Sequence, residues 1–307
     1  MPTSAAESQE ARVVASHGQR LSIVDAQGAT HAARVFGRST QVVCGDRVSC
    51  RRDAQHDTWH VLNALPRRSS IYRSNAQGRS ELIAANVDLL VVVMAPLPLP
   101  DLFVADRYLA AAECAPAAAV LLQNKTDLPS TPDTEAELSA YERAGYTVLR
   151  CSTRSGAGLD TLRERLRGCT ALLVGQSGVG KSSLLRALVP DNDARIGELM
   201  RDTDGRHTTT ATSLHPLPGG GELLDSPGVR DFAPALDRLE PRTLGFVEIA
   251  PLYGQCRFSD CRHYDEPGCA VRAAVDGGTM SSRRYESYRR LRRLYEDHVR
   301  RVKSGGR

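Results

Sequence analysis

The chain has 307 residues, with 40 basic and 36 acidic side chains and a formal net charge of +4. Its length predicts about two or three domains, and its 41% apolar and 25% charged residues exclude wholesale disorder. The longest apolar run, residues 89–95, cannot span a bilayer, and residues 1–10 lack a secretory signal, so we expect a cytoplasmic, monomeric protein with no membrane partner.

The N-terminal part of the chain is predicted to be a small β domain. Residues 1–10 have the composition of a flexible leader, and glycines separate the short β-favouring segments that follow. Such spacing is typical of a small barrel or sandwich. The expected strands are 11–14, 21–24, 33–36, 41–43, 46–48 and 58–62. Residues 67–86 are basic and polar and are interpreted as a connector.

From residue 87 to 232, buried strands alternate with helical stretches, which predicts a largely parallel sheet with helices on both faces. The expected strands are 89–94, 118–123, 147–151, 171–174 and 222–224, and the expected helices are 101–113, 133–144, 158–167 and 181–189. The last part, 233–307, contains a Cys/His cluster and an Arg-rich helix over 279–303.

A phosphate-binding loop is the strongest motif. The residues Gly175, Gln176, Ser177, Gly178, Val179, Gly180, Lys181 and Ser182 match G-x-x-x-x-G-K-S, with Ser183 next, between a predicted strand and a predicted helix. Backbone N–H groups and the helix N-terminus favour phosphate oxygens, Lys181 would reach the β- and γ-phosphates, and the Ser182 hydroxyl would bind Mg²⁺. A nucleoside triphosphate is therefore the expected ligand.

A second motif indicates the base. Asn124, Lys125, Thr126 and Asp127 follow a predicted strand. A carboxylate there accepts from guanine N1–H and its exocyclic amine, whereas adenine presents a mismatched acceptor. In an arbitrary sequence the string would be an ordinary polar turn, but beside a phosphate loop it favours GTP/GDP.

Two further segments follow these motifs in the chain. Asp225 to Gly228 (D-S-P-G) could hold Mg²⁺ through Asp225 and sense the γ-phosphate through the Gly228 N–H, and Thr209 or Thr210 of the Thr208–Thr210 run could add a ligand. Val229 stands where many GTPases have a glutamine, which predicts slow intrinsic hydrolysis. His207 is the candidate for positioning water; an exposed loop histidine is the alternative.

The order of the motifs is unusual, because N-K-T-D precedes the phosphate loop and D-S-P-G comes last. This order resembles the circularly permuted GTPases of the small ribosomal subunit biogenesis family (RsgA-like). The resemblance implies an OB-type β-barrel over 11–66, a permuted P-loop GTPase domain over 87–232 and a zinc-binding helical domain over 233–307. It also implies that Ser152 belongs to the guanine loop, although Thr153 replaces the alanine usual there.

Cys256, Cys261, His263 and Cys269 lie within 14 residues. Three cysteines and a histidine are a common closed ligand set for zinc, which predicts one structural Zn²⁺ rather than a catalytic metal. Core thiols with no common role are the alternative.

Residues 280–307 hold ten basic against three acidic side chains, so this tail carries +7 and the remainder carries −3. Arginine and tyrosine on one helix are suited to phosphate and unpaired-base contacts, although the same helix could simply pack its apolar stripe on the GTPase. With the resemblance, the expected partner is the small (30S) ribosomal subunit through 16S rRNA. A GTPase coupled to late subunit assembly is the first hypothesis; a GTP-gated rRNA-binding factor with incidental hydrolysis is the second, and a P-loop ATPase or kinase the third.

Overall fold

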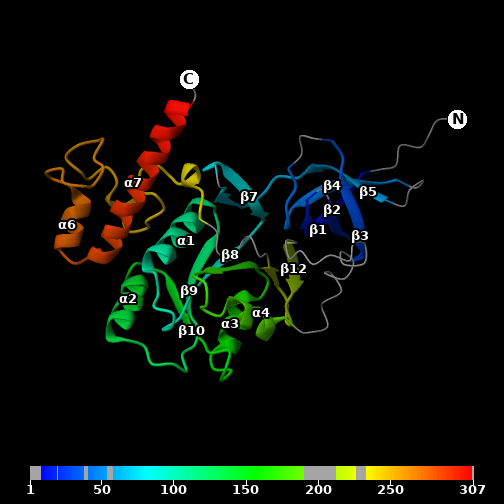
Figure 1. The fold of residues 1–307 in the computed structure, drawn as a ribbon, viewed down its shortest axis with the longest axis horizontal. Helices are drawn as coiled ribbons and strands as arrows, with labels where there is room; N and C mark the ends of the chain where they lie inside the picture. The colour runs from blue at the N-terminus through cyan, green and yellow to red at the C-terminus, as the bar shows by residue number, and fades with distance from the viewer. Residues whose placement is uncertain are drawn as a thin grey trace.

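The structure is a computed structural model that describes residues 8–18, 20–37, 41–53, 58–75, 77–189, 212–225 and 233–305. Figure 1 shows the N-terminal strands and the C-terminal helices at opposite ends of the long axis, with the central sheet between them. An N-terminal barrel, an α/β core and a C-terminal Cys₃His region with helices confirm the predicted fold class.

Five strands close the N-terminal barrel in the order β1-β2-β3-β5-β4, because β1 also pairs with β4. Five strands is the number found in OB barrels. Within β4, buried Val48 and Cys50 alternate with outward-facing Arg47 and Arg51, which is the period-2 pattern of a strand with one face on a core. The strands are β1 Gln9–His17, β2 Arg20–Asp25, β3 Thr30–Val35, β4 Arg47–Asp53 and β5 Thr58–Ala64.

Three expectations for this part are wrong. Gln9 and Glu10, assigned to the leader, pair with β4, and residues 41–43 form no strand. The connector is a hairpin of β6 (Ser70–Ser74) and β7 (Ser80–Ala85). Its polar composition hides two buried side chains, Ile71 and Leu82, that anchor it to the core.

The central sheet has the order β10-β9-β8-β11-β13-β12, in which the first five strands are parallel and β12 is antiparallel to β13. All six residues of β8 are buried, as expected for a strand covered on both faces. The strands are β8 Leu89–Met94, β9 Ala118–Gln123, β10 Thr147–Arg150, β11 Thr170–Gly175, β12 Thr212–Pro216 and β13 Glu222–Asp225.

Helices cover both faces of this sheet. Even-numbered residues of β8 pack with Tyr108 of α1 and Tyr141 of α2, whereas its odd-numbered residues pack with Leu162 of α3 and Leu184 of α4. The helices are α1 Leu102–Cys114, α2 Pro132–Arg143, α3 Leu159–Leu166 and α4 Lys181–Leu188.

The polar strand β12 was not expected, and it joins the two sheets. Ala15 and Ser16 of β1 pair with Ser213 and Thr212, so hydrogen bonding runs from the barrel into the central sheet. Arg12 adds an ion pair of 2.6 Å to Glu222. Barrel and core are thus attached by backbone as well as side chains.

The C-terminal region packs on α1. Phe103 and Ala110 of α1 share a core with Phe246, Tyr288 and Leu291. The predicted long helix is present as α7 (Ser282–Gly305), whereas α6 (Ala270–Asp276) lies where the sequence suggested only loop. The two 3₁₀ turns are η2 Leu236–Arg238 and η3 Ala250–Leu252. Within the described ranges, none of the helices is both long and apolar enough to cross a membrane.

Candidate functional site

The phosphate loop connects β11 to α4, at the carboxyl edge of the parallel sheet. Gly175 and Gly180 have φ values of 143° and 99°, and a Cβ at Gly180 would lie 2.3 Å from the Asn124 amide nitrogen. Glycine is therefore required where the loop passes Asn124. The buried Lys181 ammonium donates to the carbonyls of Gly175 at 2.6 Å and Gln176 at 2.8 Å, which holds it over the loop.

The second motif touches the phosphate loop directly. Asn124 is fully buried and donates through Nδ2 to the Val179 carbonyl at 2.9 Å. Lys125 donates through Nζ to the Gly178 carbonyl at 2.6 Å. Although these contacts join residues 55 and 53 positions apart in the chain, the two motifs lie together, with Asn124 linking the two loops.

Asp127 and Ser152, the two residues expected at the guanine base, are in direct contact. The Ser152 hydroxyl donates to Asp127 Oδ1 at 2.5 Å and accepts from the N–H groups of Arg154 and Ser155. The hydrogen bond from Ser152 lowers the pKa of Asp127 below its ordinary value of 3.8. The carboxylate is thus charged at neutral pH and oriented by a buried serine.

A loop that was not singled out in the sequence braces the phosphate loop. Gln176 accepts from the Asp101 N–H at 2.8 Å and donates to the Leu99 carbonyl at 3.0 Å, and Lys125 also donates to the Leu97 carbonyl at 2.8 Å. The repeated prolines of residues 96–100 carry no nucleotide motif, so only tertiary structure identifies this loop.

The remaining nucleotide candidates have different outcomes. Thr126 and Ser177 are exposed beside the site, and Ser182 and Ser183 lie in the first turn of α4. Asp225 ends β13, which pairs with β11, so its carboxylate belongs to the same sheet edge. His207, Thr208–Thr210, Gly228 and Val229 lie outside the described residues.

The four metal candidates converge. The ligand atoms of Cys256, Cys261, His263 and Cys269 all lie within 4.8 Å of one another, and His263 Nδ1 is 3.4–3.5 Å from each sulfur. A tetrahedral zinc ion bound at usual distances separates sulfur and nitrogen ligands by about 3.6 Å. The cluster therefore suits a metal ion, and its donor set favours zinc.

Neighbouring groups fix these ligands. The N–H groups of Ala270 and Arg272 donate to the sulfurs of Cys256 and Cys269, and the Tyr285 hydroxyl donates to the His263 carbonyl at 2.6 Å. Burial raises the pKa of the Cys261 thiol, and a bound cation would favour its thiolate form. The hydrogen bond from Tyr285 to the His263 carbonyl joins the cluster to α7.

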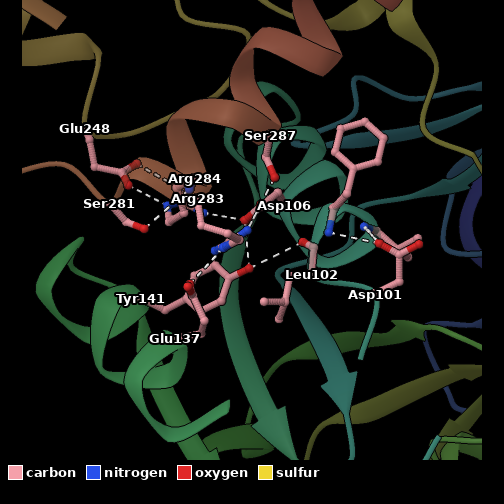
Figure 2. A network of polar contacts seen from close by, with 12 residues as sticks. Asp101, Leu102, Asp106, Glu137, Tyr141, Glu248, Ser281, Arg283, Arg284 and Ser287 are labelled. Atoms are coloured by element: carbon pink, nitrogen blue, oxygen red, sulfur yellow. Dashed lines mark hydrogen bonds and ion pairs between the residues drawn. The ribbon is translucent and has the colours of Figure 1, made fainter. Parts of the chain in front are cut away.

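Two arginines of α7, Arg283 and Arg284, have a structural role. Arg284 is 1% exposed and forms ion pairs with Asp106 of α1 and with Glu248, at 2.6 and 2.5 Å (Figure 2). Arg283 contacts Asp106 and, at 2.8 Å, Glu137 of α2. Burial opposes the charge of Arg284, but its carboxylate partners outweigh it and raise the pKa.

The tail is thus divided between packing and an outward basic face. Arg284 and Arg292 are buried, whereas the exposed basic residues of α7 are Arg290, Arg293, Arg300, Arg301 and Lys303. The inner face of the helix packs on the core, whereas these outer basic side chains face solvent, and RNA contact by them stays a prediction.

Comparisons with known proteins agree with this arrangement. The family model described as RsgA GTPase matches residues 64–234. The chain is 46% identical over 254 residues to the small ribosomal subunit biogenesis GTPase RsgA of Azotobacter vinelandii, covering 81% of this chain and 74% of that protein. It is 41% identical over 292 residues to the RsgA of Ectopseudomonas mendocina, covering 92% and 84%.

Two solved structures share the architecture. YjeQ from Thermotoga maritima superposes with a TM-score of 0.73 at 27% identity, covering 95% of this chain and 99% of that one. YloQ, a circularly permuted GTPase, gives a TM-score of 0.71 at 23% identity, covering 95% and 96%. The latter supports the fold alone.

Proposed function

The chain belongs to the RsgA family of GTPases and is a GTP hydrolase, and we propose that it acts on the small (30S) ribosomal subunit. There it would couple GTP hydrolysis to a late step of subunit assembly in the cytosol, as a single copy. The observation that carries the nucleotide part is the contact between the two motifs: Asn124 and Lys125 bind the carbonyls of Val179 and Gly178.

In this proposal the two motifs hold opposite ends of GTP. Asp127, oriented by Ser152, accepts from the guanine N–H groups, and Lys125 lies along the base. Lys181 and the N-terminus of α4 would stabilise the negative charge of the β- and γ-phosphates while water attacks the γ-phosphorus and its bond to the β–γ bridging oxygen breaks. Ser182 and Asp225 would hold Mg²⁺, which supplies further positive charge to the phosphates, and GDP and phosphate leave as products.

We assign one structural Zn²⁺ to Cys256, Cys261, His263 and Cys269. The ligand distances fit a tetrahedral ion, and four protein ligands leave no open position for catalysis. The ion would hold the loops between η3 and α6 against α7, where Tyr285 contacts the His263 carbonyl.

The partner is proposed from charge placement and family membership. The outward face of α7 presents Arg293, Arg300 and Arg301, which are suited to the backbone phosphates of 16S rRNA. The barrel and the β6–β7 hairpin are further RNA-contact candidates. The alternative, a GTP-gated rRNA-binding factor with incidental hydrolysis, makes the same contacts and differs only in turnover.

The test measures GTP and ATP hydrolysis with and without purified 30S subunits. We expect slow GTP hydrolysis by the protein alone, strong stimulation by 30S subunits, and no comparable ATP hydrolysis. Tight GTP-dependent 30S binding without stimulation would favour the alternative. The absence of 30S binding in any nucleotide state would contradict both.

A further inference from the structure

Two arginines from different parts of the chain meet at one aromatic ring. The guanidinium carbon of Arg290, on α7, lies 4.0 Å from the centroid of Phe103, and that of Arg107, on α1, lies 5.8 Å from it. Phe103 itself is buried in the core shared by α1 and α7. The two positive charges therefore lie together at the seam between these helices.

Neither guanidinium is paired directly, although the Asp101 carboxylate acts on Arg107 from further away. Among the residues that the structure describes, Arg107 and Arg290 form no ion pair or hydrogen bond, and Arg107 Nε is buried without a partner. Burial, with a smaller contribution from Arg290, lowers the pKa of Arg107. Arg283 and Arg284, at the other end of the same seam, are paired with carboxylates. A partly buried cation beside a like charge is costly unless an anion joins it.

We propose that Arg107 and Arg290 form a clamp for a backbone phosphate of the small subunit RNA at the seam between α1 and α7. The proposal rests on the proposed function, because it takes the 30S subunit as the source of the phosphate. Guanidinium groups bind phosphate oxygens in bidentate geometry, and the nearby exposed Arg293 extends the basic surface along α7. Such a contact orients the protein without reading sequence.

Two hydrogen bonds connect the helix that carries Arg107 to the phosphate loop. The Phe103 N–H donates to the Asp101 side chain at 3.0 Å, and the Asp101 N–H donates to Gln176 of the phosphate loop at 2.8 Å. RNA bound by Arg107 and Arg290 would therefore lie beside α1, the helix whose capping residue, Asp101, braces Gln176. Through these contacts the clamp links docking to the position of the phosphate loop.

The experiment uses Arg107→Met and Arg290→Met in the full-length chain, because methionine keeps an apolar stem and removes the charge. Arg167→Met is the matched control: this exposed arginine pairs with Glu164 after α3, on the opposite face of the sheet. Binding to 30S subunits is measured between about 50 and 200 mM salt. For each test variant we expect about fivefold to tenfold weaker binding and a salt slope smaller by about 1.

Two further readouts separate the clamp from a structural role. Basal GTP hydrolysis should be unchanged, while the 30S concentration for half-maximal stimulation rises by the same factor as the affinity falls. The melting temperature of Arg107→Met should be equal to or above that of the wild type, since an unpaired partly buried charge is removed. If Arg107→Met failed to fold, the exposed Arg290→Met would decide alone.

Wild-type affinity and salt slope in both test variants would overturn the clamp while leaving the proposed function intact. Loss of 30S binding with unchanged binding to protein-free 16S rRNA would indicate an acidic protein contact and would overturn the RNA assignment. No 30S binding by the wild type would instead overturn the proposed function, and the clamp with it.

Discussion

The ion-pair network between α1 and α7 predicts how firmly the C-terminal region is held. Asp106 is buried and accepts from Arg284 at 2.6 Å, from the Tyr141 hydroxyl at 2.8 Å and from Arg283. Asp106→Asn removes the negative charge that these donors share. Because Arg284 keeps its two bonds to Glu248, the cost should lie at the lower end for breaking a buried pair, about 3 kcal/mol.

The assay is native-state hydrogen exchange of the α7 amides, because a chain with several domains need not unfold in one step. In Asp106→Asn the opening free energy of α7 should fall by about 3 kcal/mol, with little change in the barrel amides. Glu137→Gln is the matched control: among the described residues this half-buried carboxylate pairs only with Arg283, and its loss should cost about 1 kcal/mol or less. Equal protection of α7 in Asp106→Asn and the wild type would refute the reasoning.

Asp127→Asn should weaken GTP binding by about 100-fold, because two charge-assisted hydrogen bonds to guanine are lost; nucleotide titration measures this, and unchanged GTP affinity would contradict the assignment. Because the Ser152 hydrogen bond lowers the pKa of Asp127, the carboxylate stays charged at any pH above that lowered value. The preference for GTP over ATP should therefore persist from about pH 8 to pH 5. Loss of the preference by pH 5 would show that the pKa of Asp127 is raised instead. Gly180→Ala should reduce GTP affinity at least tenfold, since its Cβ would meet Asn124 at 2.3 Å, whereas Gly219→Ala, which also has positive φ but an open Cβ position, should bind GTP normally. Cys261→Ser should reduce the bound zinc below about one ion per chain, measured by elemental analysis, and lower the melting temperature. The control Cys169→Ser, outside the cluster, should retain the ion. A full complement of zinc in Cys261→Ser would contradict the ligand set.

Most of the expected chemistry could be predicted from short sequence motifs. The phosphate loop, N-K-T-D and the cysteine–histidine spacing were all legible because their residue types recur at short, fixed intervals along the chain. The strands 89–94 and 118–123 were predicted to the residue, since continuous apolar runs bounded by turn residues admit few interpretations. By contrast, the polar strand β12 was missed because it pairs with β1, far away in the sequence, and the hairpin at 70–85 was missed because its polar composition hides the buried Ile71 and Leu82.

The sequence by itself was enough to predict which groups bind phosphate, guanine and a metal, since those functions depend on residue identity at close spacing. Only the tertiary structure decided which arginines are engaged: Arg284 is enclosed by Asp106 and Glu248, whereas Arg290 and, on α1, Arg107 have no carboxylate paired with them among the described residues. Asp106 and Arg284 are 178 residues apart in the chain. Charge can be counted from composition, but whether it is neutralised depends on which side chains the fold brings together.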